Sequence, residues 1–484
     1  MSKLIGARGA KKKSFRNWSG SVRTNPQEFL QPRSIEEVSQ VVQRAGSVRT
    51  VGAGHSFTPV AAGDDVMMNL DHLSGIVSVD RQLKRVRFLA GTRLRDVPRL
   101  LRPFGLALAN QGDVDPQSLA GAISTSTHGT GIGFTGFAGT VTGLRLVDAV
   151  GQLRSFSLDE DPEQLRLVVV SIGALGVVVE VEMQCVDAFD LLADESGGDI
   201  DDILDNFEAY SREVDHFECY WFPHTQAAMT KRNTRLAPGE PTPGRKTAQR
   251  SKIKRFVDDE VLGNGTYAAL LGIGRVVPQT IPSFNKFATS VISHNRYRAS
   301  AHEVFVSPRR VRFHEMEYAV PLADGPEAVR EIRRLIDAQG WQIALPLELR
   351  TTASDDVALS TANGRESMYI AFHVPRFKNP YEYMPKVEPI LKAAGGRPHW
   401  GKMNTLTRAD FSALYPRFDE FCALREELDP QWRFGSDYMR RVFGWSVVVS
   451  VNENDYHLRN DYTRDCSFWI PGQRQNHRAQ SPAG

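Results

Sequence analysis

The sequence predicts an α+β protein of two domains. Its 484 residues exceed what one hydrophobic core usually serves, and 41% hydrophobic with 24% charged residues is an ordinary globular composition. Strand-like and helix-like segments follow each other along most of the chain. We expect a basic arm over 1–15, a first domain over 16–190, a second over 191–410, a C-terminal segment over 411–444 and a tail over 445–484.

Capping and periodicity place the elements of the first domain. Ser34-Ile-Glu-Glu37 is a capping box followed by apolar residues at helical spacing, which predicts a helix over 35–45. A second helix is expected from Arg93 to just before Gly105, and Pro162 is typical of the first turn of a third. Short β-rich runs predict strands, with a hairpin formed by the sixth and seventh, at 48–51, 66–70, 76–80, 86–90, 106–110, 141–147, 153–157 and 177–185.

The second domain shows a different mixture of elements. A helical pattern at 326–339 lies among β segments at 216–222, 311–321, 345–352 and 368–373. This mixture favours an α+β domain. Residues 237–256 are broken by Pro and Gly and then basic, which indicates a solvated loop and leaves an anion or membrane contact as the alternative.

Charge and cysteine content exclude several classes of protein. A net charge of +2, from 59 basic and 57 acidic residues, argues against a nucleic-acid binder and favours small-molecule chemistry. No apolar run is long enough for a membrane span, and the N-terminus does not resemble a secretory signal, so we expect a cytoplasmic protein. The four separated cysteines are interpreted as buried thiols: Cys185, Cys219, Cys422 and Cys466.

Several site motifs fail on spacing. His314-Glu-Met-Glu-Tyr318 begins like a metalloprotease helix, but Tyr318 stands where the second ligand is needed, so no metal is expected. Gly129-Thr-Gly131-Ile-Gly133 lacks both the GxGxxG spacing and a preceding strand, which excludes a Rossmann site. Neither a Walker A lysine nor a GxSxG elbow is present.

Two glycine-rich loops with a histidine each remain, VGAGHSF and STHGTG. Loops of this composition can turn backbone N–H groups toward a phosphate-bearing cofactor, or can simply form tight turns at the edge of a sheet. The residues alone leave both interpretations open.

Seven stretches in this order resemble the FAD-linked sugar-lactone oxidases of the vanillyl-alcohol-oxidase superfamily: VGAGHSFTP, NQGDVDPQSLAGAISTSTHGTG, SIGALGVVVEV, FHEMEYAVP, LELR, RPHWGK and LDP…F…DYMRRVFG. They extend from about residue 16 to 444 and are most similar to the L-gulono-1,4-lactone type. The resemblance implies the two-domain fold of that superfamily. It has an N-terminal FAD-binding domain, an α+β substrate (cap) domain with an antiparallel sheet, and a return of 411–444 to the FAD domain.

The resemblance implies that His55 binds FAD covalently through a ring nitrogen, where the residues alone allow a hydrogen-bonded loop histidine. A covalent imidazolyl group raises the reduction potential of the flavin. About a third of the other implied FAD contacts should only shape turns. These contacts are Gly52, Ala53, Gly54, Ser56, Phe57, Gly121, Ala122, Ser124, Thr127, His128, Gly129, Thr130, Gly173, Gly176 and Val178.

The resemblance also implies catalytic roles for Glu348, Arg350 and Lys402. Glu348 and Arg350 alternate along a strand and so share a face, although an exposed ion pair is the ordinary interpretation of Glu-x-Arg. Ser118 is implied as a substrate-side contact. His373 is either a second such contact or a hydrogen-bonded core histidine, because Pro375 replaces a polar residue of alditol oxidase.

The implied reaction is oxidation of the C2 alcohol of an aldono-1,4-lactone by hydride transfer to FAD, giving a 2-keto-lactone of the ascorbate type. The implied partners are a small sugar lactone and an electron acceptor, either dioxygen or another compound. No nucleic acid or transmembrane segment is expected, and a peripheral membrane contact stays open. The alternatives are an alditol oxidase of the same superfamily and a non-catalytic flavin-binding protein.

Overall fold

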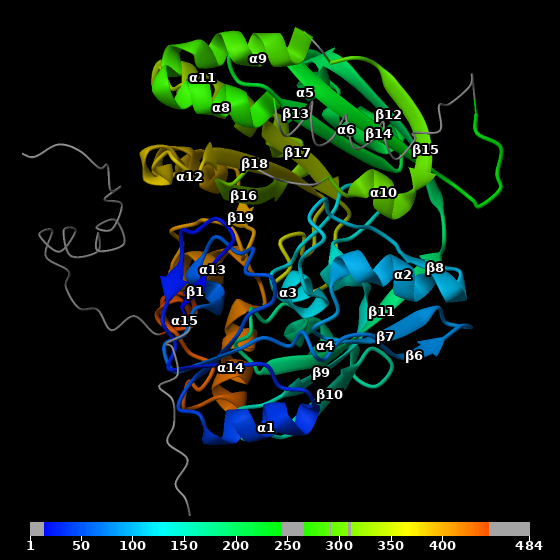
Figure 1. The fold of residues 1–484 in the computed structure, drawn as a ribbon, viewed down its shortest axis with the longest axis vertical. Coiled ribbons are helices and arrows are strands. Elements are labelled where there is room, and N and C mark those ends of the chain that lie inside the picture. The colour runs from blue at the N-terminus through cyan, green and yellow to red at the C-terminus, as the bar shows by residue number, and fades with distance from the viewer. Residues whose placement is uncertain (1–13, 244–265, 291, 308–310, 445–484) are drawn as a thin grey trace, which may run out of the picture. The chain divides into compact units, whose positions relative to one another are not determined.

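The computed structural model describes residues 14–243, 266–290, 292–307 and 311–444, all within one compact unit formed by residues 1–444 (Figure 1). Three sequence expectations lie wholly or mainly outside the described residues. They are the basic arm except for residues 14 and 15, the tail after 444, and residues 244–256 of the basic loop.

A small parallel sheet begins the fold. Its strand order is β3 (Glu28–Leu30), β5 (Val66–Met68), β4 (Val48–Thr50), and the helix α1 (Ile35–Arg44) connects β3 to β4. Half of the predicted capping box is confirmed, because the Ser34 side chain accepts a hydrogen bond from the Glu37 N–H, whereas the Glu37 carboxylate accepts from the Arg33 N–H and not from that of Ser34. Val38 and Val42 of this helix are fully buried. A two-stranded hairpin precedes the sheet, formed by β1 (Phe15–Arg16) and β2 (Arg23–Thr24).

A six-stranded antiparallel sheet completes the first half of the chain. Its path is β10-β9-β11-β7-β6, with β8 paired to β11. The predicted hairpin of β9 and β10 is confirmed by the pairing of Leu153 with Val147. The strands are β6 (Ile76–Asp80), β7 (Arg85–Leu89), β8 (Leu106–Leu108), β9 (Val141–Val147), β10 (Leu153–Ser157) and β11 (Val177–Asp187).

The helices beside this sheet are short. The single helix expected from 93 to 104 is wrong in its length: only α2 (Val97–Leu101) is α-helical, between two 3₁₀ turns. Pro98 and Pro103 explain the difference, since proline has no N–H to continue a helical ladder. Two further helices follow, α3 (Leu119–Ser124) and α4 (Pro162–Val168).

The second half of the chain forms an eight-stranded sheet of order β15-β12-β14-β13-β17-β18-β16-β19, antiparallel throughout. Its strands are β12 (Asp190–Asp199), β13 (His216–Trp221), β14 (Ala227–Leu236), β15 (Asn295–Ser300), β16 (Phe313–Pro321), β17 (Leu347–Thr352), β18 (Ser367–Pro375) and β19 (Arg397–Pro398). Its helices are α5 (Ile200–Asp205), α6 (Phe207–Glu213), α8 (Thr266–Val276), α9 (Ile281–Ser290), α10 (Ala301–Phe305), α11 (Gly325–Ala338) and α12 (Met384–Ala393). The α+β expectation is confirmed for this half.

The chain then returns to its N-terminal part through α13 (Arg408–Leu414), α14 (Phe418–Leu428) and α15 (Asp437–Phe443). The Val48 N–H donates to the Arg433 carbonyl at 2.8 Å, and the Arg49 guanidinium donates to the Phe434 carbonyl. These bonds tie the C-terminal segment to the parallel sheet. The domain limits at 190/191 and 410/411 stay predictions.

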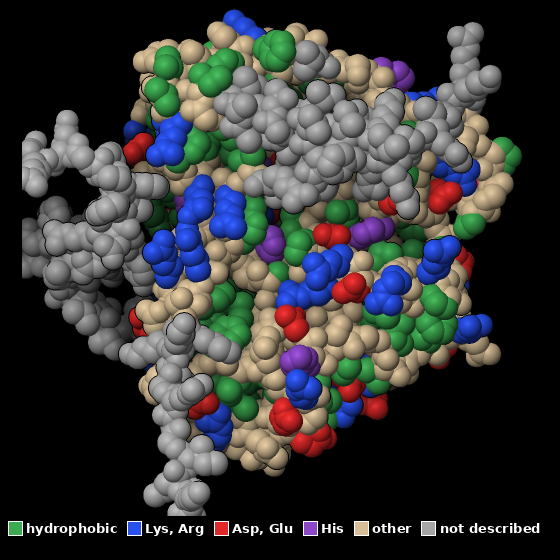
Figure 2. Space-filling view, in the orientation of Figure 1, with side chains coloured by type: hydrophobic (Ala, Val, Ile, Leu, Met, Phe, Trp, Pro, Cys, Tyr) green, Lys and Arg blue, Asp and Glu red, His purple; other side chains and the backbone are tan. Residues whose placement is uncertain are grey.

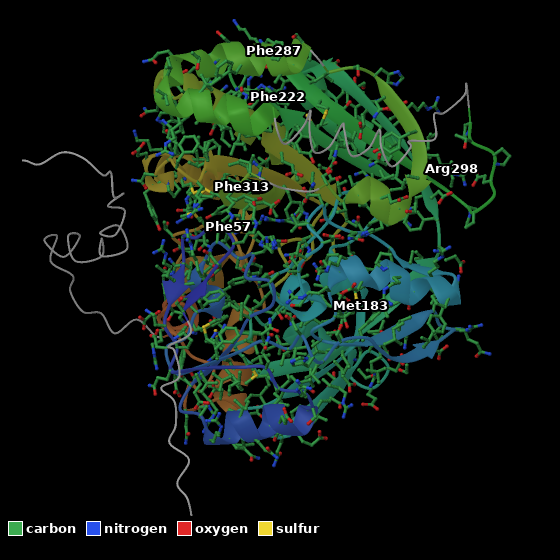
Figure 3. All side chains as sticks on the ribbon, viewed as in Figure 1. Phe57, Met183, Phe222, Phe287, Arg298 and Phe313 are labelled. Atoms are coloured by element: carbon green, nitrogen blue, oxygen red, sulfur yellow. The ribbon has the colours of Figure 1, made fainter. Side chains whose placement is uncertain are left out.

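The two sheet regions meet through aromatic side chains. Phe57, from the glycine-rich loop after β4, and Phe313, from β16, stack with their ring centroids 6.0 Å apart (Figure 3). Trp18 packs edge-on against both rings. The N-terminal half of the chain is thereby joined to the eight-stranded sheet where the two glycine-rich loops lie.

Surface and thiol properties agree with the composition. Figure 2 shows a group of Lys and Arg side chains at the left of the face in view, and Lys and Arg mixed with Asp and Glu towards the right and below. None of the described helices combines the length and apolar character that a membrane crossing requires. Cys185, Cys219 and Cys422 are buried free thiols as predicted, and Cys466 lies outside the described residues.

Candidate active site

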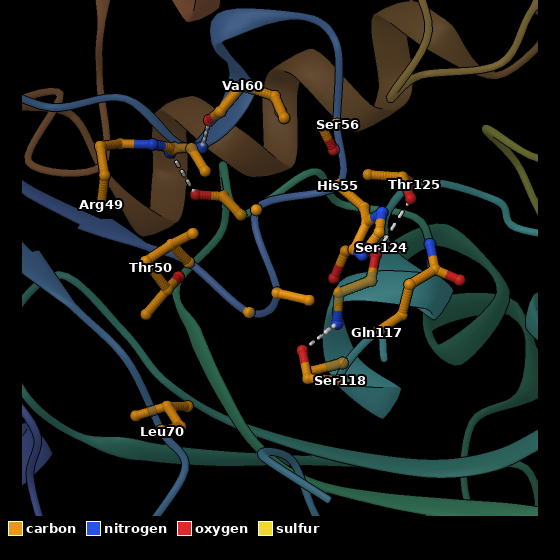
Figure 4. A pocket seen from close by; sticks show the side chains of 18 of the residues that line it. Arg49, Thr50, His55, Ser56, Val60, Leu70, Gln117, Ser118, Ser124 and Thr125 are labelled. Carbon is orange, nitrogen blue, oxygen red and sulfur yellow. Dashed lines mark hydrogen bonds between the residues drawn. The ribbon is translucent and has the colours of Figure 1, made fainter. Parts of the chain in front are cut away.

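A first cavity lies between the parallel sheet and α3 and encloses about 1030 Å³, open solvent included (Figure 4). Three segments that are distant in the sequence line it: the loop after β4, the start of α3 and the loop before β11. The predicted residues on this cavity are Gly52, Ala53, Gly54, His55, Ser56, Ser118, Gly121, Ser124, Gly173, Gly176 and Val178.

The loop after β4 presents unused backbone donors to this cavity. Among the described residues, the N–H groups of residues 52–56 have no hydrogen-bond acceptor, whereas three of their carbonyls accept bonds from outside the loop. The Gly54 carbonyl accepts from the Trp18 N–H at 2.7 Å, and Gly54 itself has a φ of +67° that favours glycine. Consecutive free N–H groups of this kind form a nest for an anion, which fits a pyrophosphate.

Two glycines are required by the space around them. A Cβ on Gly52 would overlap the Ser118 hydroxyl. Gly176 has a φ of +156°, and a Cβ there would lie 2.5 Å from the Val147 carbonyl oxygen. Any larger residue at these positions would push neighbouring atoms into the cavity or strain the backbone.

A second cavity opens between the two sheet regions and shares His55, Ser56, Gln117 and Thr125 with the first. Its predicted lining residues are Phe57, Thr127, His128, Glu348, Arg350, His373 and Lys402. The structure therefore brings all three predicted catalytic side chains into one space that meets the first cavity at His55. Ser118 lines the first cavity and not the second.

Three predicted cofactor contacts line neither cavity: Ala122, Gly129 and Thr130. Ala122 is buried within α3. Thr130 connects its loop to the eight-stranded sheet, because its hydroxyl donates to the Phe217 carbonyl and accepts from the Thr351 N–H. Three of the fifteen implied contacts is a fifth, fewer than the third that was expected to shape turns, and one of the three lies in a helix.

Glu348 and Arg350 are held together on β17. Both are buried, and the Arg350 guanidinium contacts the Glu348 carboxylate directly. Arg350 Nε also donates to Glu218 Oε2 at 2.9 Å, and the Tyr220 hydroxyl donates to Glu348 Oε1 at 3.1 Å. The pairing of β13 with β17 places Glu218 opposite Arg350 and Tyr220 opposite Glu348.

The charges around Arg350 stabilise each other. Burial alone would lower the pKa of Arg350, but Glu348, Asp113 and Glu218 outweigh burial and raise it. Burial alone would raise the pKa of Glu218, but Lys231 and Arg350 lower it to about 2. Both groups are therefore ionised near neutral pH, which makes Arg350 a fixed cation of the second cavity.

Lys402 is the second fixed cation. Its Nζ contacts Glu315 Oε2 and lies 4.0 Å from Glu317 Oε2. Burial alone would lower the pKa of Lys402, but the two carboxylates outweigh burial and raise it. The ammonium also lies 5.2 Å from the centroid of the Phe57 ring.

The backbone around Lys402 is bonded to both sheet regions. The His399 and Met403 N–H groups donate to the carbonyls of Glu317 and Glu315 on β16, each at 2.9 Å. The Gly401 carbonyl accepts from the Phe57 N–H at 2.6 Å. Residues 399–403 therefore join the loop of His55 to β16.

His55 stands where the two cavities meet. Its ring stacks on Trp18 at a centroid distance of 5.4 Å, and neither ring nitrogen is hydrogen-bonded to any part of the chain that the structure describes. Burial, reinforced by Lys402 and Arg93, lowers its pKa to about 4. The imidazole is therefore neutral at neutral pH, with a ring nitrogen free to bond to a ligand.

His373 lies at the edge of the second cavity. Its Nδ1 donates to the Pro346 carbonyl at 3.0 Å, and its Nε2 is 3.6 Å from Glu315 Oε1. His373 therefore lines the cavity, as a substrate contact would, and also has a hydrogen-bond partner, as a core histidine would. The structure is compatible with both interpretations of this residue.

Sequence reasoning did not single out five ionisable residues of this region: Asp113, Glu218, Glu315, Glu317 and His399. Glu315 and Glu317 alternate along β16 as Glu348 and Arg350 do along β17, so both carboxylates face the same side. That alternation was a usable signal within FHEMEYAVP. His314 and Glu315 lie in a strand, and not in a metalloprotease-like helix.

The fold and the first cavity define a class of protein. A family described as FAD binding domain matches residues 26–157. A solved structure of a solvent-stable cholesterol oxidase has the same fold, with a TM-score of 0.74 and 21% sequence identity over 90% of this chain and 98% of that chain. The protein is an FAD-dependent oxidoreductase with the two-domain α+β fold of the vanillyl-alcohol-oxidase superfamily.

Comparison of sequences narrows the class to one family. A family described as D-arabinono-1,4-lactone oxidase matches residues 181–442. An L-gulono-1,4-lactone dehydrogenase from Mycobacterium tuberculosis is 37% identical over 433 residues, covering 88% of this chain and 98% of that protein. The L-gulonolactone oxidase of Mus musculus is 30% identical over 452 residues, covering 90% and 99%. The chain belongs to this family of sugar-lactone oxidases.

Proposed function

We propose that the protein oxidises the C2 alcohol of an aldono-1,4-lactone, L-gulono-1,4-lactone or a similar sugar lactone. The product is a 2-keto-lactone that enolises to an ascorbate-type compound. One observation carries this proposal: Glu348, Arg350 and Lys402 share a buried cavity that meets the glycine-lined cavity at His55. The names of the relatives in the family support the choice of substrate.

The residues of the first cavity are suited to hold FAD. The free N–H groups of residues 52–56 would bind its pyrophosphate, and Gly173, Gly176 and Val178 would contact its adenosine half. His55 would bond covalently to the flavin ring through a ring nitrogen, because its imidazole is neutral and has no hydrogen bond within the described chain.

The residues of the second cavity perform the proton chemistry. When bound, FAD supplies the two-electron acceptor that takes the hydride from C2. Glu348 polarises the C2 hydroxyl and receives its proton, while Arg350 favours the ionised carboxylate beside it. Arg350 and Lys402 supply positive charge that offsets the negative charge developed during the reaction.

Anaerobic bleaching of the visible flavin band tests the substrate class. We expect L-gulono-1,4-lactone or D-arabinono-1,4-lactone to bleach the purified holoenzyme within one turnover, and xylitol and sorbitol to bleach it far more slowly. Faster bleaching by the open-chain polyols would make the protein an alditol oxidase. A band that stays oxidised with every sugar would indicate a non-catalytic flavin-binding protein.

Denaturation tests the bond to His55. On a denaturing gel, the wild-type polypeptide should carry flavin fluorescence, and His55→Ala should not. His72→Ala is a matched control, since His72 is an exposed histidine of the same half of the chain and lines neither cavity. Release of all FAD from the denatured wild type would exclude the covalent bond.

The electron acceptor can be identified with the same preparation. In air, the amount of hydrogen peroxide formed per molecule of lactone oxidised is measured. Under argon, the rate at which the same lactone reduces an artificial dye is measured. Stoichiometric peroxide identifies an oxidase, and turnover only with the dye identifies a dehydrogenase.

A further inference from the structure

Arg49 is a buried arginine at the centre of β4, shortly before the glycine-rich loop that holds His55. It is among the residues that line the first cavity, but the proposed reaction does not use it. Burial lowers its pKa to about 10, although Asp429 partly offsets this effect, so the guanidinium is charged near neutral pH. A buried guanidinium needs acceptors for its N–H groups, and here the backbone supplies them.

The acceptors are carbonyl groups from three separate segments of the chain. One terminal nitrogen of Arg49, Nη1, donates to the Gly173 carbonyl at 2.8 Å and to the Phe434 carbonyl at 2.6 Å. The other, Nη2, donates to the Ile172 carbonyl at 3.0 Å and also to the Val60 carbonyl (Figure 4). All of these residues except Phe434 line the first cavity, whereas Phe434 belongs to the returning C-terminal segment. One side chain therefore ties two walls of the cavity to that segment.

The turn formed by Ile172 and Gly173 needs such support. Its φ angles are +44° at Ile172 and +71° at Gly173, so both residues lie in the left-handed region. This region is strained for a β-branched residue, and such a conformation persists only where its surroundings hold it. Arg49 bonds the carbonyl of each residue through a different nitrogen, and the Ile172 N–H donates to the Ser124 carbonyl at 3.0 Å. The turn is thereby held by β4 and by the end of α3.

The Phe434 carbonyl is placed by the buried Asp429. One oxygen of this carboxylate, Oδ1, accepts from the Arg433 N–H at 2.7 Å, and Oδ2 accepts from the Phe434 N–H at 2.8 Å. Asp429 and Phe434 belong to the stretch LDP…F, which the proposed reaction leaves without a role. The contacts connect this stretch to the wall of the first cavity through Arg49.

The Arg49 side chain has little room to rearrange. A Cβ on Gly63 would lie 2.7 Å from Arg49 Cγ. A lysine at this position would keep the positive charge, but its single nitrogen donates at most three hydrogen bonds and cannot reproduce the two forked pairs. Lysine therefore distinguishes the charge of Arg49 from its hydrogen bonds.

We propose that Arg49 is a positioning residue that pre-forms the turn at residues 172–173 for the cofactor and makes this turn depend on the C-terminal segment. The inference rests on the proposed placement of FAD in the first cavity, and not on the lactone reaction. Because Arg49 keeps the turn in its left-handed conformation before FAD arrives, binding does not have to supply the free energy that would order it.

The FAD affinity of the full-length chain tests this role without any substrate. In a His55→Ala background, which prevents the proposed covalent bond, Arg49→Met should raise the dissociation constant for FAD at least about tenfold, because fewer molecules have the competent turn. Arg49→Lys should raise it at least about threefold. A constant within about twofold of the background for either variant would overturn the proposal, and for Arg49→Lys it would show that charge alone suffices. If Arg49→Met does not fold, Arg49→Lys decides.

The two halves of the cofactor locate the effect. In the same apoproteins, Arg49→Met should weaken ADP binding at least about tenfold and leave riboflavin binding within about twofold, because Gly173 is assigned to the adenosine half. Equal weakening of both ligands would mean that the substitution damages the whole cavity. That result would overturn the local role of Arg49.

The matched control is Arg397→Met. Arg397 is 6% exposed and donates to the carbonyls of Leu414 at 3.0 Å and Asn363 at 2.6 Å, but lines neither cavity. This variant should lower the stability to urea and leave the dissociation constant for FAD unchanged. If it weakens FAD binding as Arg49→Met does, loss of any buried arginine is sufficient, and the proposal fails.

Asp429→Asn tests the link to the C-terminal segment. It should also weaken FAD binding, and the double variant with Arg49→Met should bind no more weakly than the weaker single variant, because both changes act on one contact. Additive losses would overturn the link. Gly52→Ala separates this inference from the placement of FAD. If neither Gly52→Ala nor Arg49→Met weakens FAD binding, the cofactor does not occupy the first cavity. If only Gly52→Ala does, the placement stands and the role of Arg49 is excluded.

Discussion

The first cavity is lined by only two charged side chains of the described chain, Arg49 and Asp71, and eleven of its other lining residues are glycine or alanine. The second is lined by six: Asp113, Glu315, Glu317, Glu348, Arg350 and Lys402. Arg49 is moreover turned away into four backbone carbonyls, those of Val60, Ile172, Gly173 and Phe434. One cavity offers shape and N–H donors, and the other offers paired charges.

The difference in lining determines which substitutions each of the two cavities tolerates. A site made of backbone loses little when a side chain is shortened and much when a Cβ is added. A site made of buried ion pairs behaves in the opposite way, because removal of one partner leaves the other charge buried and uncompensated. The two cavities should therefore respond oppositely to the same kind of substitution.

The largest effect is expected at Glu348. Glu348→Gln should slow lactone-driven flavin reduction by about 10²- to 10³-fold, because the carboxylate that receives the proton is lost. The visible spectrum of bound flavin should be unchanged. Stopped-flow reduction measures the rate, with Glu180→Gln as the control for a lost buried carboxylate. A rate within about twofold of wild type would remove Glu348 from the mechanism.

A methyl group tests the first cavity. Gly52→Ala should reduce the flavin content of the purified protein and destabilise it by about 1–3 kcal/mol, since the new Cβ overlaps the Ser118 hydroxyl. Gly133→Ala should do neither, because no atom lies within 4 Å of its added Cβ. Ser118→Ala in the Gly52→Ala background should restore part of the flavin content. Absence of that rescue would show that the clash is not the cause.

The buried His216 should make the stability of the fold depend on pH. This histidine joins β13 to the loop of His128, because its Nδ1 donates a hydrogen bond to the Thr130 carbonyl at 2.6 Å. Burial lowers the pKa of His216 to about 3. The folded state therefore binds fewer protons than the unfolded state between about pH 6.5 and 3, and stability falls as pH decreases through that window. His216→Gln should reduce this slope by up to about 1.4 kcal/mol per pH unit, measured by urea unfolding.

The exposed His294 is the control for that measurement. His294→Gln should leave the slope close to that of the wild type, since its side chain is 64% exposed. If both variants reduce the slope of unfolding free energy against pH equally, the burial of His216 does not determine that slope. The loss of any histidine charge would then be sufficient.

The smallest effect is expected at a surface ion pair. Arg44 and Glu28 form two hydrogen bonds of 2.8 and 2.7 Å, but about half of each side chain is exposed. Arg44→Ala should change the free energy of unfolding by less than about 1 kcal/mol. A larger loss in chemical denaturation would mean that charge pairs matter outside the second cavity as well.

Local patterns predicted much of the secondary structure. Ser34 marked the start of α1, Pro162 marked α4, β-rich runs located β9 and β10, and alternation indicated β17. These features depend on residues close together in the sequence, so they can be read without the fold. The broken helix around Pro98 was also readable, because two prolines five residues apart oppose one continuous helix.

The ionic partners of the site residues could not be predicted from local sequence patterns. Glu218 lies 132 residues from Arg350, and only the register between β13 and β17 places them opposite each other. Likewise, Glu317 reaches His128 across the boundary between the two sheet regions. Composition and periodicity identify which residues are buried, whereas pairing of distant charges depends on strand register. Family resemblance supplied Glu348, Arg350 and Lys402, and their FAD and substrate roles stay predictions.

The dual attachment of residues 399–403 has a consequence for engineering. Residues 399–403 are hydrogen-bonded both to Phe57 and to β16. A chimera that exchanged only residues 191–398 would therefore combine β16 of the donor protein with Lys402 of the host protein. The grafted strand and the host lysine would then have been selected in different proteins. Substrate preference should therefore transfer between relatives only when the transplanted module extends through residue 403.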